Sequence, residues 1–299
     1  MKNKPVPIKN LNKYNLTGTA SQKLCLLRML PLIIGPKVPT ENEVWRLLTL
    51  CRQIVDISLS PQVQVEDLVK LEGLIAEHNH LYGKYSPSFP SKFHFLVHYP
   101  NLIRKYGPLR NFWCMRFEAK HQNLKRLASL VRNFRNIDKT LASRQQFLQC
   151  YFFNEIHPAQ NLITSTVHAY ESNLLSEELK SELKPHLKGR ELPKKILSAK
   201  SIKSNLQVDS VLAIDCIDGN DIPIFGKINA VLKVYESWFI CCKVLLSVCF
   251  NDHFHAFEVR ETEHWHVLDP EKTGFMQCLD QYKIEDKAMV TLQYNICSN

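Results

Sequence analysis

Apolar residues recur at helical spacing along most of the first half of the chain. This pattern predicts amphipathic helices over residues 21–34, 40–59 and 63–85. A fourth helix is expected to begin at Ser91, and Pro100 is expected to separate it from a further short helical stretch. The chain is therefore predicted to begin with an all-helical region.

The helical pattern continues past the middle of the chain. A long helix is predicted from Phe117 to Asn136, because apolar side chains recur there at nearly every third or fourth position. Another helix is predicted from Asp138 to Phe153, and one more is expected to reach Leu175. These predictions extend the helical region over residues 16–171.

The spacing then changes to that of β-strands. Residues 172–204 are polar and charged and contain two prolines, so they are expected to form a linker, with one short helix in it as an alternative. Six apolar runs between residues 208 and 296 are rich in β-branched and aromatic residues, and turn-forming residues separate them. The predicted fold class is therefore α+β, with an N-terminal all-α domain and a small antiparallel β-barrel or sandwich over residues 205–299.

Charge is distributed unevenly between the two predicted domains. The formal net charge of the chain is +9, and residues 101–144 alone carry eleven Lys or Arg against two acidic residues. Residues 205–299 carry seven Lys or Arg against fourteen acidic residues. A basic block of this density is typical of a surface that binds a polyanion, nucleic acid first, whereas the acidic domain would be repelled by the same partner.

Composition narrows the class of protein further. No run of eighteen apolar residues occurs, so no membrane partner is expected, and the basic N-terminus lacks the apolar stretch of a secretory signal. The ten cysteines are scattered and include no CxxC pair. Reduced thiols are therefore expected, as in the cytoplasm or the nucleus.

Two groups of histidines raise the question of a metal site. His94 and His98 are four residues apart, so on a helix they share a face and can supply half of a zinc site. In the β-rich region the motifs HFHAFEV and HWHV place pairs of histidines at strand spacing, and a hairpin across the sequence RETE would bring the pairs together. In both groups the alternative is ordinary packing with local hydrogen bonds.

Glu118 is the single acidic residue of the stretch KFHFLVHYPNLIRKYGPLRNFWCMRFEAKH. It is expected in the first turn of the long basic helix, where a carboxylate stabilises the helix dipole by about 0.3–1 kcal/mol. The functional alternative is a carboxylate that binds a divalent metal beside a phosphate-binding surface. The residues alone leave both interpretations open.

The order of motifs in this stretch resembles that of a known family. His98, Pro100, the Gly107-Pro108 turn, Trp113 and the Phe117-Glu118 pair, followed by a basic helix with Lys125, are similar to the C-terminal half of CACTA-type (En/Spm-like) DNA transposases. The resemblance covers residues 16–155. A looser similarity extends to the catalytic core of the vertebrate antigen-receptor recombinase.

The resemblance implies an RNase H-like core with a helical insertion before its last acidic residue. In such cores three carboxylates bind two divalent metal ions for phosphoryl transfer to or from DNA. Glu118 matches the third carboxylate, and His94 with His98 match the histidine half of a structural zinc site. The chain contains no CxxC to complete that zinc site, and the only aspartates before Glu118 are Asp56 and Asp67, both in predicted helices.

The expected function is that of a transposase-derived nuclear protein with an incomplete catalytic centre that binds the DNA backbone. The residues expected to contact DNA are the basic side chains Arg104, Lys105, Lys120, Lys125, Arg126, Arg132 and Arg135. One alternative is a subunit of an active transposase or nuclease whose first two acids lie upstream or on another chain. A second is a scaffold that binds proteins through residues 205–299.

Overall fold

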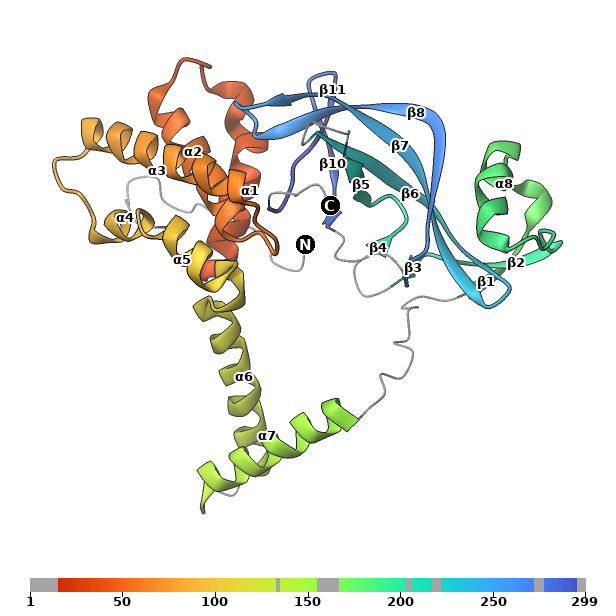
Figure 1. Ribbon diagram of the computed structural model, residues 1–299, viewed down its shortest axis with the longest axis horizontal. Helices are drawn as coiled ribbons and strands as arrows, with labels where there is room; N and C mark the ends of the chain where they lie inside the picture. The colour runs from red at the N-terminus through yellow and green to blue at the C-terminus, as the bar shows by residue number, and fades with distance from the viewer. Residues whose placement is uncertain are drawn as a thin grey trace.

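The computed structural model describes residues 16–132, 135–154, 167–202, 206–216, 222–271 and 277–294. Helices occupy the first part of the chain and a mostly antiparallel sheet the second, which confirms the predicted α+β class (Figure 1). Before the first strand the helices are α1 Ala20–Ile34, α2 Glu43–Ser58, α3 Val65–Tyr85, α4 Ser91–Leu96, α5 Tyr99–Tyr106, α6 Cys114–Val131 and α7 Ile137–Asn154.

The first five helices form a small bundle with its own core. Leu50 and Ile54 of α2 pack against Leu71 and Ile75 of α3, and Ile103 of α5 joins them. These residues recur at three- and four-residue intervals, as expected for the buried face of an amphipathic helix, and the helices themselves were predicted correctly. Figure 1 shows α1 to α5 gathered at one end of the molecule.

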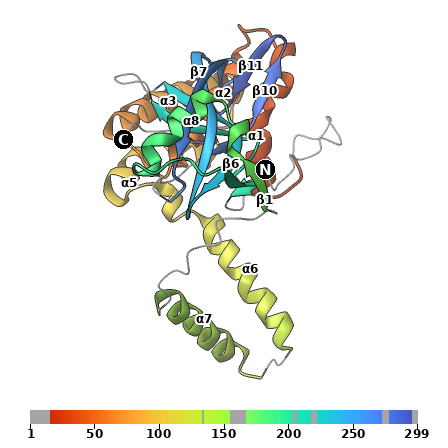
Figure 2. The same ribbon diagram turned by 90° about the vertical axis from the view of Figure 1, so that its right-hand side faces the viewer.

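Helices α6 and α7 project from this bundle as a helical arm in both views (Figures 1 and 2). The predicted helix from Phe117 to Asn136 is displaced in the structure, because α6 begins at Cys114 and ends at Val131. Helix α7 agrees with the prediction from Asp138 to Phe153. We refer to residues 114–154 as the arm.

The strands are β1 Val167–Glu171, β2 Lys195–Ala199, β3 Ser201–Ile202, β4 Leu206–Gln207, β5 Val211–Cys216, β6 Pro223–Val234, β7 Ser237–Asn251, β8 Ala256–Leu268, β9 Cys278–Leu279, β10 Gln281–Ile284 and β11 Lys287–Val290. The main sheet has the order β1-β2-β6-β7-β8-β11-β10, and β5 pairs with β6 and with β9. The long antiparallel strands β6, β7 and β8 form its centre.

Both faces of the central strand β7 are covered at its beginning. Phe239 and Cys241 face a cluster that includes the leucines of helix α8, Glu177–Leu183, whereas Ile240 and Cys242 face a cluster that includes Ile202. Successive side chains of a strand point to opposite faces, so an unbroken apolar run is required where both faces are buried. The run WFICC, residues 238–242, meets that requirement.

Residues 167–204 differ from their predicted structure. The helix expected to reach Leu175 is wrong from Val167 onward, because β1 pairs there with β2; the earlier part, 155–166, lies outside the described residues. The stretch 172–204, expected to be a linker with at most one short helix, contains the short helix α8 and, beyond that expectation, strand β2. Its leucines at positions 175, 179, 183 and 187 recur every four residues among charged ones and pack against the sheet.

The helical bundle and the sheet share a further apolar cluster. Leu32 of α1 packs with Ala256, Ile284 and Met289 of the sheet. Among the described helices, none combines the length and the apolar character that a membrane crossing requires.

Candidate nucleic-acid interface

The arm is the element that carries the densest part of the basic block. Gly107 ends α5 with φ of 78°, a conformation that glycine adopts without steric cost, and the chain turns through residues 108–113 before α6 begins. With a rise of 1.5 Å per residue, the 18 residues of α6 span about 27 Å. Figure 2 shows this helix standing clear of the bundle and the sheet, with α7 beside it.

Lys125, Arg126 and Arg132 are exposed on or directly after α6. No acidic side chain among the described residues forms an ion pair with any of the three. Lys125 and Arg132 are seven residues apart, which corresponds to about 10 Å along the helix axis.

The end of α6 has an unusual backbone. Arg132 is the residue after the helix and adopts the left-handed conformation with φ of 50°, which is uncommon for residues other than glycine and asparagine. Its amide donates to the Ala128 carbonyl oxygen at 3.2 Å. Arg135 follows in the exposed turn that leads to α7. The turn thus presents two arginines at the far end of α6.

The other residues predicted to contact DNA, Arg104, Lys105 and Lys120, lie in different surroundings. Arg104 on α5 is exposed and pairs with Glu72 of α3 at 2.9 Å, so part of its charge is neutralised within the bundle. Lys105 lies over the Tyr106 ring, 5.5 Å from its centroid. Lys120 is a residue of α6, and its side chain lies outside the described part of the structure.

Glu118 lies in the second turn of α6, not in the first turn as expected, because the helix begins at Cys114. It is exposed and shares its side of the helix with Lys125, seven residues later. Among the described residues no group of three or more His, Cys, Asp or Glu side chains gathers to bind a metal ion, around Glu118 or elsewhere. A carboxylate on this face reduces the attraction of the helix for an anion.

His94 and His98 are neighbours, although not on one continuous helix. Helix α4 ends at Leu96 and His98 caps the start of α5, so the break comes before Pro100. The two rings are perpendicular, with their centroids 5.1 Å apart, and both side chains are exposed. The described residues bring no third metal ligand to this pair.

Two histidines of the β-rich region, His253 and His255, join the sheet to the helices, whereas His264 and His266 lie on β8. The expected hairpin across RETE is wrong, because residues 256–268 form the single strand β8. His253 and His255 lie instead in the turn before β8, where His253 Nε2 contacts the Gly35 carbonyl oxygen at 2.9 Å and His255 Nε2 contacts Asp56 Oδ2 at 2.8 Å. Trp45 Nε1 donates to the His253 carbonyl oxygen at 2.9 Å.

Buried charges reinforce this junction, and their partners across it are more than 190 residues away in the sequence, so local patterns did not reveal these contacts. Arg52 is fully buried and donates to Asp56 Oδ2 at 2.7 Å and to the Leu292 carbonyl oxygen. Arg28 of α1 donates to the Gln293 carbonyl oxygen, and burial together with the nearby Arg52 lowers its pKa to about 10. Arg28 and Arg52 in the bundle interior thus bind backbone carbonyl oxygens of the segment that follows β11 rather than a ligand.

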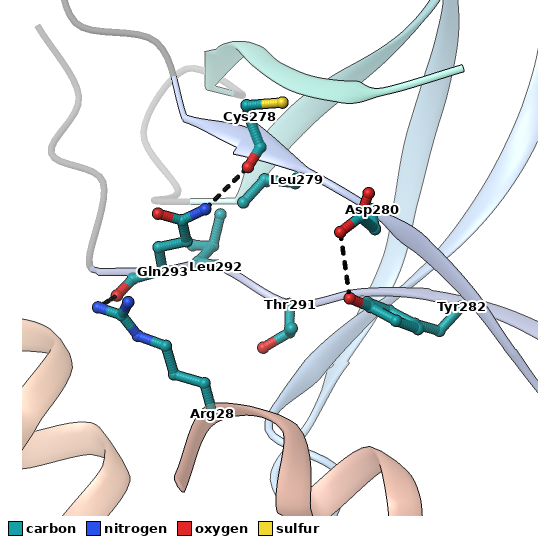
Figure 3. A pocket seen from close by; sticks show the side chains of 8 residues that line it. All are labelled: Arg28, Cys278, Leu279, Asp280, Tyr282, Thr291, Leu292 and Gln293. Carbon is teal, nitrogen blue, oxygen red and sulfur yellow. Dashed lines mark hydrogen bonds between the residues drawn. The ribbon is translucent and has the colours of Figure 1, made fainter. Parts of the chain in front are cut away.

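A small pocket lies beside Arg28 (Figure 3). Its walls include Tyr282, whose hydroxyl donates to Asp280 at 3.4 Å, and Gln293, whose amide donates to the Cys278 carbonyl oxygen at 2.8 Å. Burial raises the pKa of the Tyr282 hydroxyl. The pocket has room for about one water molecule, so it is a feature of the junction and not a substrate site.

No family model, no curated protein and no solved structure matches the chain.

Proposed function

We propose that this chain is a transposase-derived nuclear protein that binds the backbone of duplex DNA through the arm and carries out no phosphoryl transfer by itself. The observation that supports the proposal is the position of Lys125, Arg126 and Arg132. These three side chains are exposed on a projecting helix and have no acidic partner among the described residues. Ion pairing with the described residues therefore does not account for these three cations.

The dimensions of the arm agree with those of duplex DNA. A single helix fits the major groove, which is about 12 Å wide, and also fits along the phosphates that border it. Lysine and arginine bind phosphates regardless of base sequence, and each contact releases condensed counterions. The expected binding is therefore dependent on salt and nearly independent of sequence.

The test compares two variants with equal change in charge. In the arm variant Lys125, Arg126, Arg132 and Arg135 are replaced by Ala; in the control variant Lys184, Lys188, Lys194 and Lys195, all exposed and remote from α6 in sequence, are replaced by Ala. Binding to a duplex is measured by fluorescence anisotropy. The proposal predicts weaker binding and a log–log salt slope smaller by about 3.6 for the arm variant alone, since each phosphate contact contributes about 0.9.

Equal losses in the two variants would show that net charge, and not the arm, governs binding and would refute the proposal. A Glu118→Gln variant adds a second comparison. If Glu118 only opposes the nearby bases, its neutralisation raises DNA affinity by about twofold to fivefold, in the range of an exposed charge interaction. Loss of DNA cleavage in that variant, with Mg²⁺ present, would favour the nuclease alternative instead.

A further inference from the structure

Ser129 lies near the far end of α6, directly after two bases of the arm. The sequence KRLAS places Lys125 four residues and Arg126 three residues before this serine. The side chain of Ser129 is exposed, and its hydroxyl donates to the Arg126 carbonyl oxygen at 2.8 Å. A nucleophilic hydroxyl is therefore accessible on the helix whose bases are proposed to bind DNA.

Two adjacent bases shortly before a serine form a substrate pattern for protein kinases. A kinase whose peptide groove is lined by carboxylates attracts lysine and arginine at these positions and selects its substrate by charge. Two serines of the chain follow a pair of adjacent bases at this spacing, namely Ser129 and Ser198. The sequence does not distinguish between them, whereas the structure does.

Ser198 is held within the sheet. It lies on β2, opposite His168 of β1 and Leu232 of β6, so its strand is paired on both sides. A kinase binds its substrate as a free segment, and release of Ser198 requires both pairings to separate. Thr49, which follows Arg46 by three residues, is only 2% exposed. Neither hydroxyl is accessible in the folded chain.

Ser129 is placed more favourably, in the last turn of α6. The helix ends two residues later at Val131, and Arg132 adopts the left-handed conformation, so regular helical structure stops there. The last turn of a helix opens at a lower free-energy cost than a strand inside a sheet. Figure 2 shows α6 projecting from the bundle, which leaves this turn open to approach. The structure therefore favours Ser129 over Ser198.

We propose that Ser129 is a phosphorylation site for a kinase that recognises basic residues, and that its phosphorylation weakens DNA binding by the arm. The second part rests on the proposed function. In the reaction, Ser129 Oγ bonds to the γ-phosphorus of ATP while the bond from that phosphorus to the β–γ bridging oxygen breaks. ADP leaves, and the hydroxyl proton passes to the catalytic base of the kinase.

The phosphate would act directly on the bases of the arm. A phosphoserine carries a charge of about −1.5 to −2 at neutral pH. Residues three and four positions apart are neighbours on a helix, with Cβ atoms about 5–6 Å apart, so the phosphate lies within reach of Arg126 and Lys125. It neutralises these two bases within the chain and repels the phosphates of DNA. Phosphorylation therefore weakens the interaction without replacing any base.

The first experiment tests the modification itself. The folded full chain is incubated with Mg²⁺, ATP and the catalytic subunit of cAMP-dependent protein kinase, and the modified residues are identified by tandem mass spectrometry. Phosphate is expected on Ser129 and not on Ser198. The Ser129→Ala variant, treated in the same way, is expected to incorporate no phosphate above the background of a reaction without kinase.

The second experiment measures the effect on DNA binding by fluorescence anisotropy. Phosphorylation is expected to raise the dissociation constant at least about fivefold near 100 mM salt and to reduce the log–log salt slope by about 1.8, since two contacts of about 0.9 each are lost. The Ser129→Ala variant retains both bases. It is expected to bind DNA like the unmodified wild type before and after kinase treatment.

The two experiments separate the parts of the proposal. A folded chain that gains no phosphate on Ser129, or that is modified equally at Ser198, would overturn the modification site. A phosphorylated chain that binds DNA as tightly as the unmodified chain would overturn the regulatory role. An unmodified chain that does not bind DNA would refute the proposed function and the regulatory role together, while phosphate on Ser129 would still establish the modification site.

Discussion

At the scale of single residues, the buried pair of Arg52 and Asp56 stabilises the junction between the helices and the sheet. Asp56 accepts from Arg52 and contacts His255, and all three side chains are almost completely buried. Replacing Asp56 by Asn leaves the guanidinium of Arg52 buried without its counter-charge. We expect the free energy of unfolding to fall by about 3–5 kcal/mol, measured by denaturant titration.

The exposed pair of Arg46 and Glu77 provides the control. Its atoms are 2.9 Å apart, but both side chains are more than two-fifths exposed. Glu77→Gln is therefore expected to change stability by less than about 1 kcal/mol. Equal effects of the two substitutions would contradict the structural importance assigned to the buried pair.

The cysteines offer a second residue-level prediction, in which burial controls reactivity. Burial raises the pKa of Cys242 to about 12, from an ordinary value of 9.0, so its thiol stays protonated in the folded chain as the pH rises from about 7 to about 10. The exposed Cys114 and Cys150 have no such protection. Mass spectrometry after maleimide labelling of the native chain should find the exposed pair modified and Cys242 unmodified throughout this range.

A raised pKa in the folded state also has a consequence for stability. The contribution of the Cys242 thiol is complete below the unfolded pKa, near 9, and is lost as the pH rises toward about 12. Labelling of Cys242 that increases steadily between about pH 7 and pH 9, without unfolding, would contradict the burial on which this prediction rests.

At the scale of elements, the helices differ in how clearly their sequence patterns define them. Long amphipathic segments such as α2 and α3 were predicted correctly, because their apolar stripes are broad and end in recognisable ways. Helix α8 has seven residues, and its single line of leucines lies among charged residues. A stripe that narrow is difficult to distinguish from a polar linker until the sheet face that it covers is known.

Leu183 tests whether this line of leucines is part of the core. Its side chain is fully buried against the sheet, so Leu183→Ala leaves a cavity and is expected to lower the free energy of unfolding by about 2–5 kcal/mol. Leu174, a few residues earlier, is 67% exposed and provides the control. Leu174→Ala should have little effect, and equal losses in the two variants would show that α8 does not pack as described.

Strand β8 is an element whose continuity the sequence pattern did not predict. Glutamates and a threonine in RETE resemble a corner between two strands, yet they lie on an exposed part of one continuous strand paired with β7. The pairing of β8 with β7 contains two register shifts, and at such shifts the regular alternation of buried and exposed side chains is interrupted. Bulges of this kind depend on the partner strand, so alternation in a single strand does not predict them.

At the scale of the whole molecule, the sequence predicted the α+β class and the order of helices before sheet. It did not predict that the two parts are joined through Leu32, Met289 and the buried charges, because those contacts connect residues more than 190 positions apart. Of the candidate site, the basic block was evident from composition. Its placement on a projecting arm is a tertiary property that no local pattern encodes.

The central claim is that the exposed bases of the arm bind DNA phosphates without reading sequence. The most direct measurement is the affinity of the full chain for two duplexes of equal length and unrelated sequence, at salt concentrations from about 50 to about 400 mM. The predicted result is a linear log–log decline with the same slope, about −3 to −4, for both duplexes. Absence of binding at the lowest salt, or an affinity that does not change with salt, would contradict the claim.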